Sequence, residues 1–375
     1  MKKVVIVNCF DTYEDRVLLL RQFFADRGDE VTVVTSNYRH VKKRVRETFP
    51  EGFVVIPTKP YKRNISVDRL VSHSTFAEDV FERVKGLSPD ILWVLAPPNS
   101  LVKQAAKYKH LNPSVKLIVD VIDMWPETLP IPYFKNLPPL YNWRRLRDKN
   151  INAADRVVAE CGLYRAVLSK VCPREKLRTL YYAKQEKAAT SVPNPTTDRY
   201  SLCYLGSINN IIDIPCICNI IKKMPKREKP VLLHIIGDGE QRGLLISEAK
   251  KAGAEVIYHG RVYDAKEKQK IFDMCNFGLN IMKENVFVGL TMKSVDYFAG
   301  GLPIINNIKG DTWDFVNNSE VGLNYTSDQE LFFREELDKE IYRPNVVDLF
   351  NKTFTREVFY DQVRDLVESI SNKSK

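Results

Sequence analysis

The stretch VGLTMKSVDYFAGGLPII, residues 288–305, has the pattern of a loop, a helix and a buried strand. Thr291 is a residue type that begins helices, and the glycines at 300 and 301 are typical of a helix end. Lys293 falls in the first turn, where the helix dipole disfavours a cation by roughly 0.3–1 kcal/mol. Asp296 follows three residues later, so both side chains are expected on one helix face. This arrangement matches a nucleotide, with a phosphate at the helix tip and a ribose below it; the alternative is a solvated Lys–Asp pair.

Strand and helix patterns alternate along the 375 residues, first in one half of the chain and then in the other. Buried-strand runs such as VVIVNC, ILWVLAP and KLIVDVID are separated by helix-period segments, which is typical of a parallel sheet wound with helices. Small and polar residues with two prolines at 184–200 predict a linker, after which YSLCYLGS restarts the pattern. The sequence therefore predicts an α/β fold with two Rossmann-like doubly wound domains, residues 1–183 and 201–345, and C-terminal helices at 346–375. Because ligands bind at the carboxyl ends of such strands, we expect the functional cleft between the domains.

The charge is uneven along the chain. Residues 1–183 contain 31 Lys+Arg and 20 Asp+Glu, whereas the rest of the chain contains 26 Lys+Arg and 27 Asp+Glu. The net charge of +10 therefore comes from the first half. The basic clusters at 40–47, 59–63 and 142–149 include the aromatic residues Tyr61 and Trp143. We therefore expect the first domain to bind an anionic membrane surface peripherally, with a solvated basic face as the alternative. Nucleic acid is not expected as a partner, because no basic–aromatic motif of a known nucleic-acid module is present.

The distribution of cysteine, acidic and apolar residues argues against several kinds of site and of protein. The seven cysteines are scattered and form no CxxC pair, so neither a disulfide framework nor a zinc site is expected. No Asp-x-Asp motif lies near a strand end, so the site is expected to work without a metal, and no other cofactor is expected. A run of about 18 apolar residues, as a membrane span needs, is absent. The expected location is the cytoplasm, at the inner face of the plasma membrane.

Three strand-to-helix junctions in the second domain carry glycine. Glycine permits positive φ and lets a ligand approach the backbone, and free amides at the following helix starts suit a phosphate. None of the junctions has the spacing GxGxxG or GxxxxGK[ST], so neither a dehydrogenase-type dinucleotide site nor a P-loop is supported. The alternative at each junction is a tight turn alone. The junction residues are Gly206 and Ser207 in YLGSINN, Gly237, Asp238 and Gly239 in IIGDGEQ, and Gly260, Arg261 and Val262 in HGRV.

These junctions, together with SVDYFAGGLPII, resemble the donor domain of GT-B glycosyltransferases of the retaining family four. DMWPETLP at 123–130 is similar to the Asp-x-Trp-Pro-Glu segment of family members that build bacterial capsule, O-antigen or exopolysaccharide. The resemblance implies that the C-terminal helix crosses back to the first domain. It also implies transfer of a hexose-type sugar, with retention, from a nucleotide diphosphate sugar to a glycan acceptor, which we expect to be polyprenyl-linked.

The resemblance also implies roles for particular residues. The family typically carries two glutamates at a fixed spacing; the second matches Asp296, which would hold the ribose, and the first matches Val288. Glu284 is the expected substitute toward the donor sugar. Ser207 and Ile211 replace the arginine and lysine that hold the diphosphate in the family, so we expect Lys293 to take over, with Arg242 as second candidate. The residues expected to bind the donor nucleotide are Gly206, Ser207, Gly237, Asp238, Gly239, Arg261, Val262, Gly289, Leu290, Thr291 and Asp296.

In the first domain, Asp123 and Glu127 flank Trp125 after a predicted strand. A ring beside carboxylates is typical of a sugar-binding surface, because the ring covers C–H faces and the acids accept hydrogen bonds from hydroxyls. Asp123, Glu127 and Lys293 are therefore the expected catalytic residues, and a proline-bounded turn around a core tryptophan is the alternative for the first two. Two other functions stay open for the chain: a nucleotide-sugar 2-epimerase of the same fold, and a non-catalytic GT-B partner subunit.

Overall fold

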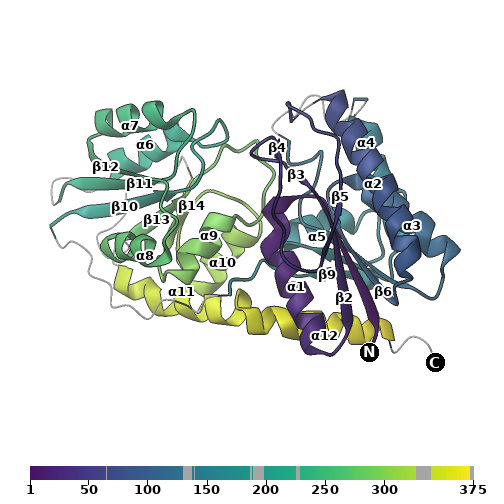
Figure 1. Cartoon of the computed structure of the whole chain (residues 1–375). Helices are drawn as coiled ribbons and strands as arrows, with labels where there is room; N and C mark the ends of the chain where they lie inside the picture. The colour runs from purple at the N-terminus through teal and green to yellow at the C-terminus, as the bar shows by residue number, and fades with distance from the viewer. Residues whose placement is uncertain are drawn as a thin grey trace. The chain divides into compact units, whose positions relative to one another are not determined.

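The computed structural model describes residues 1–64, 66–129, 137–138, 140–185, 188, 198–224, 229–326 and 339–371. The chain divides into two compact units (Figure 1). Unit 1 comprises Met1–Tyr181 and Tyr360–Lys375, and unit 2 comprises Tyr182–Phe359. Most of the linker predicted at 184–200 lies outside the described residues, as do Pro130 and residues 372–375.

Unit 1 contains a parallel sheet of seven strands in the order β5-β2-β1-β6-β7-β8-β9. Its central strands are buried, as near-continuous runs of Val, Ile and Leu predict for a sheet covered on both faces. A short antiparallel hairpin, β3 (Tyr38–Arg39) with β4 (Arg44–Val45), follows β2. The sheet strands are β1 (Lys3–Asn8), β2 (Glu30–Ser36), β5 (Phe53–Ile56), β6 (Ile91–Ala96), β7 (Lys116–Val121), β8 (Arg156–Ala159) and β9 (Leu177–Thr179).

Helices connect the strands of unit 1, and α2 and α3 pack side by side (Figure 1). The end of α12 belongs to this unit, because the ring of Tyr360 packs on Phe23 and Arg156 donates to Ser369 O at 3.0 Å. This return of the C-terminal helix is the one that the resemblance implied. The helical segments of unit 1 are η1 (Asp11–Tyr13), α1 (Glu14–Asp26), α2 (Val67–Leu87), α3 (Asn99–Leu111), α4 (Leu140–Asp148), η3 (Ile151–Ala153), α5 (Gly162–Leu168), η4 (Arg174–Lys176) and the end of α12 (Arg356–Ser371).

Unit 2 contains a second parallel sheet, of six strands in the order β12-β11-β10-β13-β14-β15. Helices α6 and α7 lie on one face of it and α8 on the other (Figure 1). The prediction of two doubly wound parallel sheets is thereby confirmed. The strands are β10 (Tyr200–Leu205), β11 (Val231–Ile236), β12 (Ala254–Gly260), β13 (Phe277–Asn280), β14 (Ile304–Asn306) and β15 (Gly322–Asn324); the helices are α6 (Ile214–Lys223), α7 (Arg242–Lys251), α8 (Ala265–Met274), α9 (Met292–Ala299), α10 (Asp311–Ser319) and α11 (Lys339–Thr353).

Helix α9 begins and ends where its sequence predicts. Thr291 caps it, because the Thr291 hydroxyl accepts from Ser294 N at 3.2 Å and the Ser294 hydroxyl accepts from Thr291 N at 3.3 Å. This reciprocal capping box satisfies two backbone donors at the helix start. Gly300 closes the helix, and Gly301 follows with a φ of +63°. No helix in the described ranges is long and apolar enough to cross a membrane.

Candidate functional site

The glycine turns of unit 2 lie at the carboxyl edge of its sheet. Gly206, Gly237 and Gly260 have φ values of +123°, +136° and +70°, a region that favours glycine. A Cβ on Gly237 would lie 1.9 Å from the Gly206 carbonyl oxygen, and one on Gly239 would lie 2.3 Å from that of Ile208. Glycine is required at 237 and 239 because neighbouring loops touch there, and a role of both in nucleotide binding stays a prediction. At Gly206 and Gly260 a Cβ would meet nothing within 4 Å, so these two turns leave room beside the backbone.

Two arginines lie close to the carboxylate of Asp238 at this edge. The carboxylate accepts from Gly239 N at 2.9 Å and from Arg242 Nη1 at 3.3 Å, and Arg261 Nη2 lies 3.7 Å away. The side chains of Arg242 and Arg261 are 48% and 63% exposed, and Arg242 also donates to the Tyr258 hydroxyl at 3.4 Å, while Asp238 limits the net charge of the pair. This turn therefore offers cations, but in a well-solvated place where each ion pair contributes little.

The loop before α9 carries the remaining predicted nucleotide contacts. Gly289 is buried, and its carbonyl accepts from Thr312 N at 2.9 Å and from Thr312 Oγ1 at 2.8 Å, which joins the loop to α10. Leu290 is half-buried and Glu284 is exposed. Among the turn residues, Ser207 is exposed and Val262 is half-buried.

Lys293 is buried at the start of α9. Only 9% of the residue is exposed, and its Nζ lies 5.0 Å from the centre of the Tyr204 ring. No carboxylate of the described chain lies within ion-pair distance of this ammonium. Burial lowers the pKa of Lys293 from its usual 10.5 to about 7. A desolvated, unpaired cation at a helix start is costly, and an anion bound beside it would offset that cost.

Asp296, one turn further along α9, is engaged elsewhere. Its Oδ1 lies 2.7 Å from Lys184 Nζ and 3.4 Å from Lys268 Nζ, and its side chain is 20% exposed. The solvated pair of Lys293 with Asp296, which was the alternative for this helix, is therefore wrong. A ribose hydroxyl that binds Asp296 has to share the carboxylate with two lysines or displace one of them.

Two carboxyl groups follow neighbouring strands at the carboxyl edge of the unit 1 sheet. Asp123 comes shortly after β7, and Glu160 comes directly after β8, where its N donates to Val121 O at 3.1 Å. Burial raises the pKa of Asp123 to about 6 and that of Glu160 to about 8, and the Asp123 charge adds to the second shift. The pKa of Tyr13 and that of Tyr164 are raised as well, mainly by burial and to a smaller extent by the charges of these two carboxyl groups. Sequence reasoning missed Glu160, although an acid directly after the strand run RVVA was a visible signal.

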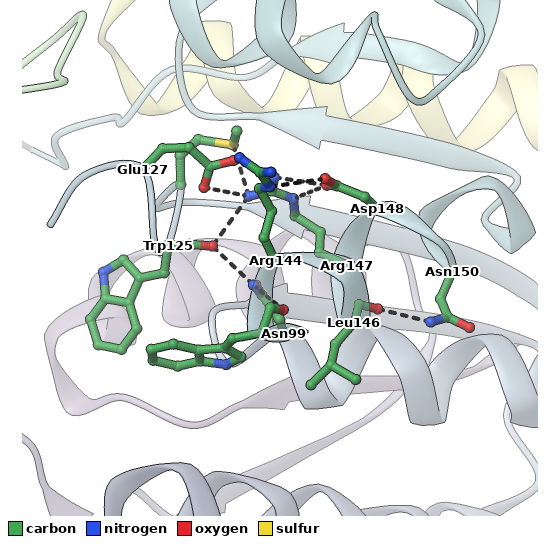
Figure 2. A network of polar contacts seen from close by, with 10 residues as sticks. Asn99, Trp125, Glu127, Arg144, Leu146, Arg147, Asp148 and Asn150 are labelled. Atoms are coloured by element: carbon green, nitrogen blue, oxygen red, sulfur yellow. Dashed lines mark hydrogen bonds and ion pairs between the residues drawn. The ribbon is translucent and has the colours of Figure 1, made fainter. Parts of the chain in front are cut away.

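Glu127 is held in an ion pair with Arg147 of α4, as Figure 2 shows. Arg147 Nη2 lies 2.7 Å from Glu127 Oε1, Nη1 lies 3.2 Å from Oε2, and Asp148 Oδ1 lies 2.8 Å from Nη2. Arg147 Nη1 and Asn99 Nδ2 both donate to Trp125 O, at 3.3 and 2.9 Å. These contacts fix the segment that follows Asp123, and a catalytic role for Glu127 stays a prediction. Arg147 is 1% exposed, so it does not belong to the basic surface that its cluster predicted.

The ring of Trp125 is not an exposed platform for a sugar. The residue is 8% exposed, and Arg69 Cζ lies 3.5 Å from the centre of its ring. Tyr61 and Trp143 are 3% and 6% exposed, so the aromatic residues that were expected to reach a membrane are buried as well. Packing against neighbours therefore decides the position of all three rings, while the roles of Asp123 and Glu127 stay predictions.

No protein-family model matches the sequence, and no curated protein matches it. Several solved structures match this chain. The lipopolysaccharide outer core galactosyltransferase WaaB, in its apo form, matches with a TM-score of 0.68 at 14% identity, over 98% of this chain and 99% of that chain. Sucrose-phosphate synthase from Thermosynechococcus elongatus matches with a TM-score of 0.67 at 13% identity, over 100% of both chains. Anabaena HepE in complex with UDP and glucose matches with a TM-score of 0.61 at 11% identity, over 98% of this chain and 100% of that chain. The chain has the GT-B fold. At such identities the likeness establishes the fold alone.

Within this GT-B fold, the three glycine turns of unit 2 meet at one sheet edge. Backbone hydrogen bonds join the turns, from Ile208 N to Asp238 O at 3.0 Å and from Gly237 N to Gly260 O at 2.7 Å. Lys293 is linked to them through Tyr204, whose hydroxyl donates to the carbonyl oxygen of Ser207 at 2.9 Å. Among the described residues, no group of three or more His, Cys, Asp or Glu side chains is arranged to hold a metal ion.

Proposed function

We propose that this GT-B chain is a glycosyltransferase that moves a hexose-type sugar, with retention, from a nucleotide diphosphate sugar to a glycan acceptor. The fold supports the reaction class, and HepE, which was solved with UDP and glucose, supports the donor class. In the proposed reaction, the bond between the sugar carbon and the diphosphate oxygen breaks through an oxocarbenium-like state. The acceptor hydroxyl attacks the same face of the sugar, and the departing diphosphate takes its proton.

The observation that carries this proposal is the buried, unpaired ammonium of Lys293. The folded unit has already removed most water from this lysine and lowered its pKa to about 7, and a diphosphate that binds beside it favours the charged form again. An ion pair at an effective dielectric of about 20 is worth roughly 4 kcal/mol before the phosphate is desolvated. The same charge stabilises the diphosphate as it leaves, which is how positioned cations lower the barrier of such reactions.

Other residues of unit 2 complete the proposed donor site. The amides of Gly206, Gly237 and Gly239 already donate within the chain, at 2.9, 2.7 and 2.9 Å, so these turns contribute close approach of the backbone, and Arg242 and Arg261 stand beside them in solvent. We assign the ribose to Asp296, in competition with its two lysines, and the donor sugar to Glu284. Ser207 and Ile211 carry no charge, so Lys293 is the main cation of this proposed clamp.

The proposed acceptor side lies in unit 1. Asp123 is the candidate that contacts the acceptor hydroxyl, and the contacts of Arg147 with Glu127 and Trp125 O hold its segment in place. Glu160 joins it as a second carboxyl at the same sheet edge. A pKa of about 6 leaves Asp123 ionised and able to accept a hydroxyl hydrogen bond above that pH.

A lipid-linked acceptor at an anionic membrane is the finer part of the proposal, and the β3–β4 hairpin supports it. Val41 and Val45 are 69% and 48% exposed there, next to exposed lysine and arginine. Lys43 donates to Asn64 and lies 4.6 Å from the centre of the Tyr61 ring, which joins the hairpin to the second basic cluster. Apolar tips among cations suit an anionic bilayer surface. The exposed basic residues of this hairpin patch are Lys42, Arg44, Lys59, Lys62 and Arg63.

The test is incubation of the full chain with labelled nucleotide sugars, with and without glycan acceptors. Release of nucleotide that requires an acceptor supports transfer. An isomerised nucleotide sugar would instead indicate the 2-epimerase, and tight binding without turnover would indicate a partner subunit; either result would overturn the proposal. Lys250→Ala, which removes an exposed lysine from the last turn of α7, is the control that should leave release unchanged.

A further inference from the structure

Arg69, on α2, lies inside a set of aromatic rings in unit 1. The residue is 1% exposed, and its Cζ lies 3.5 Å from the ring centre of Trp125, 5.7 Å from Tyr61 and 5.9 Å from Trp143. His73, from the same helix, stacks on Trp125 at 6.1 Å. We call the rings of Tyr61, His73, Trp125 and Trp143 the aromatic cage. Burial lowers the pKa of Arg69 to about 10, so the guanidinium stays charged at neutral pH.

The guanidinium is not satisfied inside the aromatic cage. Its Nη1 donates to Asn64 O at 2.6 Å, whereas Nε and Nη2 are buried without a hydrogen-bond partner among the described residues. Both ring nitrogens of His73 are buried without a partner in the same way. No carboxylate of the described chain pairs with Arg69. Because buried polar atoms in native proteins are nearly always paired, such a group of unpaired nitrogens points to a partner from outside the chain.

A second buried arginine of unit 1 shows what this pair of nitrogens binds. Arg16 is 3% exposed, and its Nε and Nη2 donate to the two carboxylate oxygens of Asp120 at 2.8 and 2.9 Å. Two parallel N–H bonds to the oxygens of one anion are the preferred use of this edge of a guanidinium. Arg69 presents the same edge without a carboxylate. Its complement is therefore an anionic group with two accepting oxygens, such as a phosphate or a carboxylate.

A cavity of about 200 Å³ adjoins the aromatic cage, and Arg69 is one of the residues that line it. The rest of the lining is mainly apolar, from Leu70, Leu129, Leu140 and Trp143. Val67 also lines the cavity and is 70% exposed, so it marks the rim. Burial of an apolar group in this space is favourable, at roughly 25 cal/mol for each Å² removed from water. The combination of one cation with apolar walls suits an amphiphile.

We propose that the aromatic cage binds an oxyanion carried on an apolar body, with the oxyanion on Nε and Nη2 of Arg69 and the apolar body in the adjoining cavity. These two nitrogens are covered in the present state, so the wall beside them moves when the ligand enters. Trp125 and Trp143 change their surroundings in that step, and their fluorescence reports it. The site does not depend on the nucleotide site of unit 2 or on the proposed reaction, so each can fail alone.

The experiment titrates the full chain with octyl phosphate, octanoate, 1-octanol and inorganic phosphate, followed by calorimetry and tryptophan fluorescence. At least one of the two octyl anions should bind about tenfold or more tighter than both 1-octanol and inorganic phosphate, because only it engages arginine and cavity together. The preference between octyl phosphate and octanoate identifies the oxyanion. Failure of both octyl anions to bind, or equal binding of 1-octanol or inorganic phosphate, would overturn the proposal.

Variants locate the binding. Arg69→Gln should lose the preference for the anions, whereas Arg83→Gln, which removes an exposed arginine from the same helix, should keep it. Because Arg69 is buried and its loss can unfold the unit, Val67→Trp serves as a second variant: this exposed rim position tolerates a large ring that blocks the cavity. Val67→Trp should weaken binding of the octyl anions about tenfold or more with unchanged thermal stability. Wild-type affinity in the folded Val67→Trp variant would place the ligand elsewhere.

Discussion

Lys293 and Asp296 lie one turn apart on α9 and do not pair. The Lys293 ammonium points to the ring of Tyr204 at 5.0 Å, while the Asp296 carboxylate binds Lys184 and Lys268 at 2.7 and 3.4 Å. The helix therefore keeps a buried cation without an internal counter-ion at its N-terminal end, next to the glycine turns. This separation underlies the proposed function, because a paired Lys293 would have little to gain from a phosphate.

The buried ammonium makes the stability of the chain depend on pH. The pKa of Lys293 is lowered from 10.5 to about 7, so the unfolded chain binds more protons than the folded one between these values, and the free energy of unfolding rises with pH through this window. Lys293→Met removes the cost, and each pKa unit corresponds to about 1.4 kcal/mol. Urea unfolding should show the variant more stable than wild type by more than about 1.4 kcal/mol below pH 7, with a gain that shrinks toward pH 10.5. An equal gain at both ends of the window would contradict burial of the charged form.

Asp296→Asn tests the assignment of the ribose. A hydrogen bond to a charged group contributes about 1.5–3 kcal/mol, so nucleotide affinity should fall about tenfold or more by calorimetry. Asp348→Asn, at an exposed carboxylate that pairs with Lys352 on α11, is the control and should leave affinity unchanged. If a folded Asp296→Asn variant bound nucleotide as wild type does, Asp296 would serve only its two lysines.

Gly237→Ala tests whether the glycine turns are built by contact between loops. The new Cβ would lie 1.9 Å from the Gly206 carbonyl oxygen at a φ of +136°, so steric overlap adds to backbone strain, for a total cost of about 2–4 kcal/mol. Gly243→Ala is the matched control, because its Cβ would meet nothing within 4 Å and alanine favours the helix α7 by up to about 1 kcal/mol. Thermal unfolding should separate the two variants by sign. A neutral Gly237→Ala would mean that the two loops do not approach as described.

The sequence predicts the two sheets well and the site only in part. Buried strands such as β6 and β11 are continuous apolar runs, and the α9 boundaries follow from Thr291 and the glycines, so local patterns suffice for them. The spacing of Lys293 and Asp296 tells which side chains are neighbours on one helix, but not that Tyr204 of β10 covers the first of them. The aromatic cage escapes prediction for the same reason, because α2, the segment after β5, the segment after β7 and α4 meet there only in the folded unit.

Membrane binding is tested by flotation of the chain with vesicles. Wild type should float with anionic vesicles and not with neutral ones, and high salt should reverse the binding, since screening weakens contacts between cations and lipid. The double change of Val41→Asp with Lys42→Glu removes one apolar tip and one cation from the exposed hairpin and should abolish most flotation. Lys250→Glu, on unit 2, should have no effect. Equal flotation with neutral and anionic vesicles would leave the basic face as a solvated surface.

The central claim is that Lys293 binds the diphosphate, and calorimetry of Lys293→Ala with a nucleoside diphosphate and with the matching nucleoside tests it most directly. Loss of an ion pair worth roughly 4 kcal/mol before desolvation should weaken the diphosphate about a hundredfold and leave the nucleoside nearly unchanged. Turnover of the nucleotide sugar should fall by a similar factor, because the variant lacks the side chain that stabilises charge on the leaving diphosphate. Lys250→Ala should match wild type for both ligands. Equal weakening of diphosphate and nucleoside by Lys293→Ala, or wild-type affinity for both, would contradict the account.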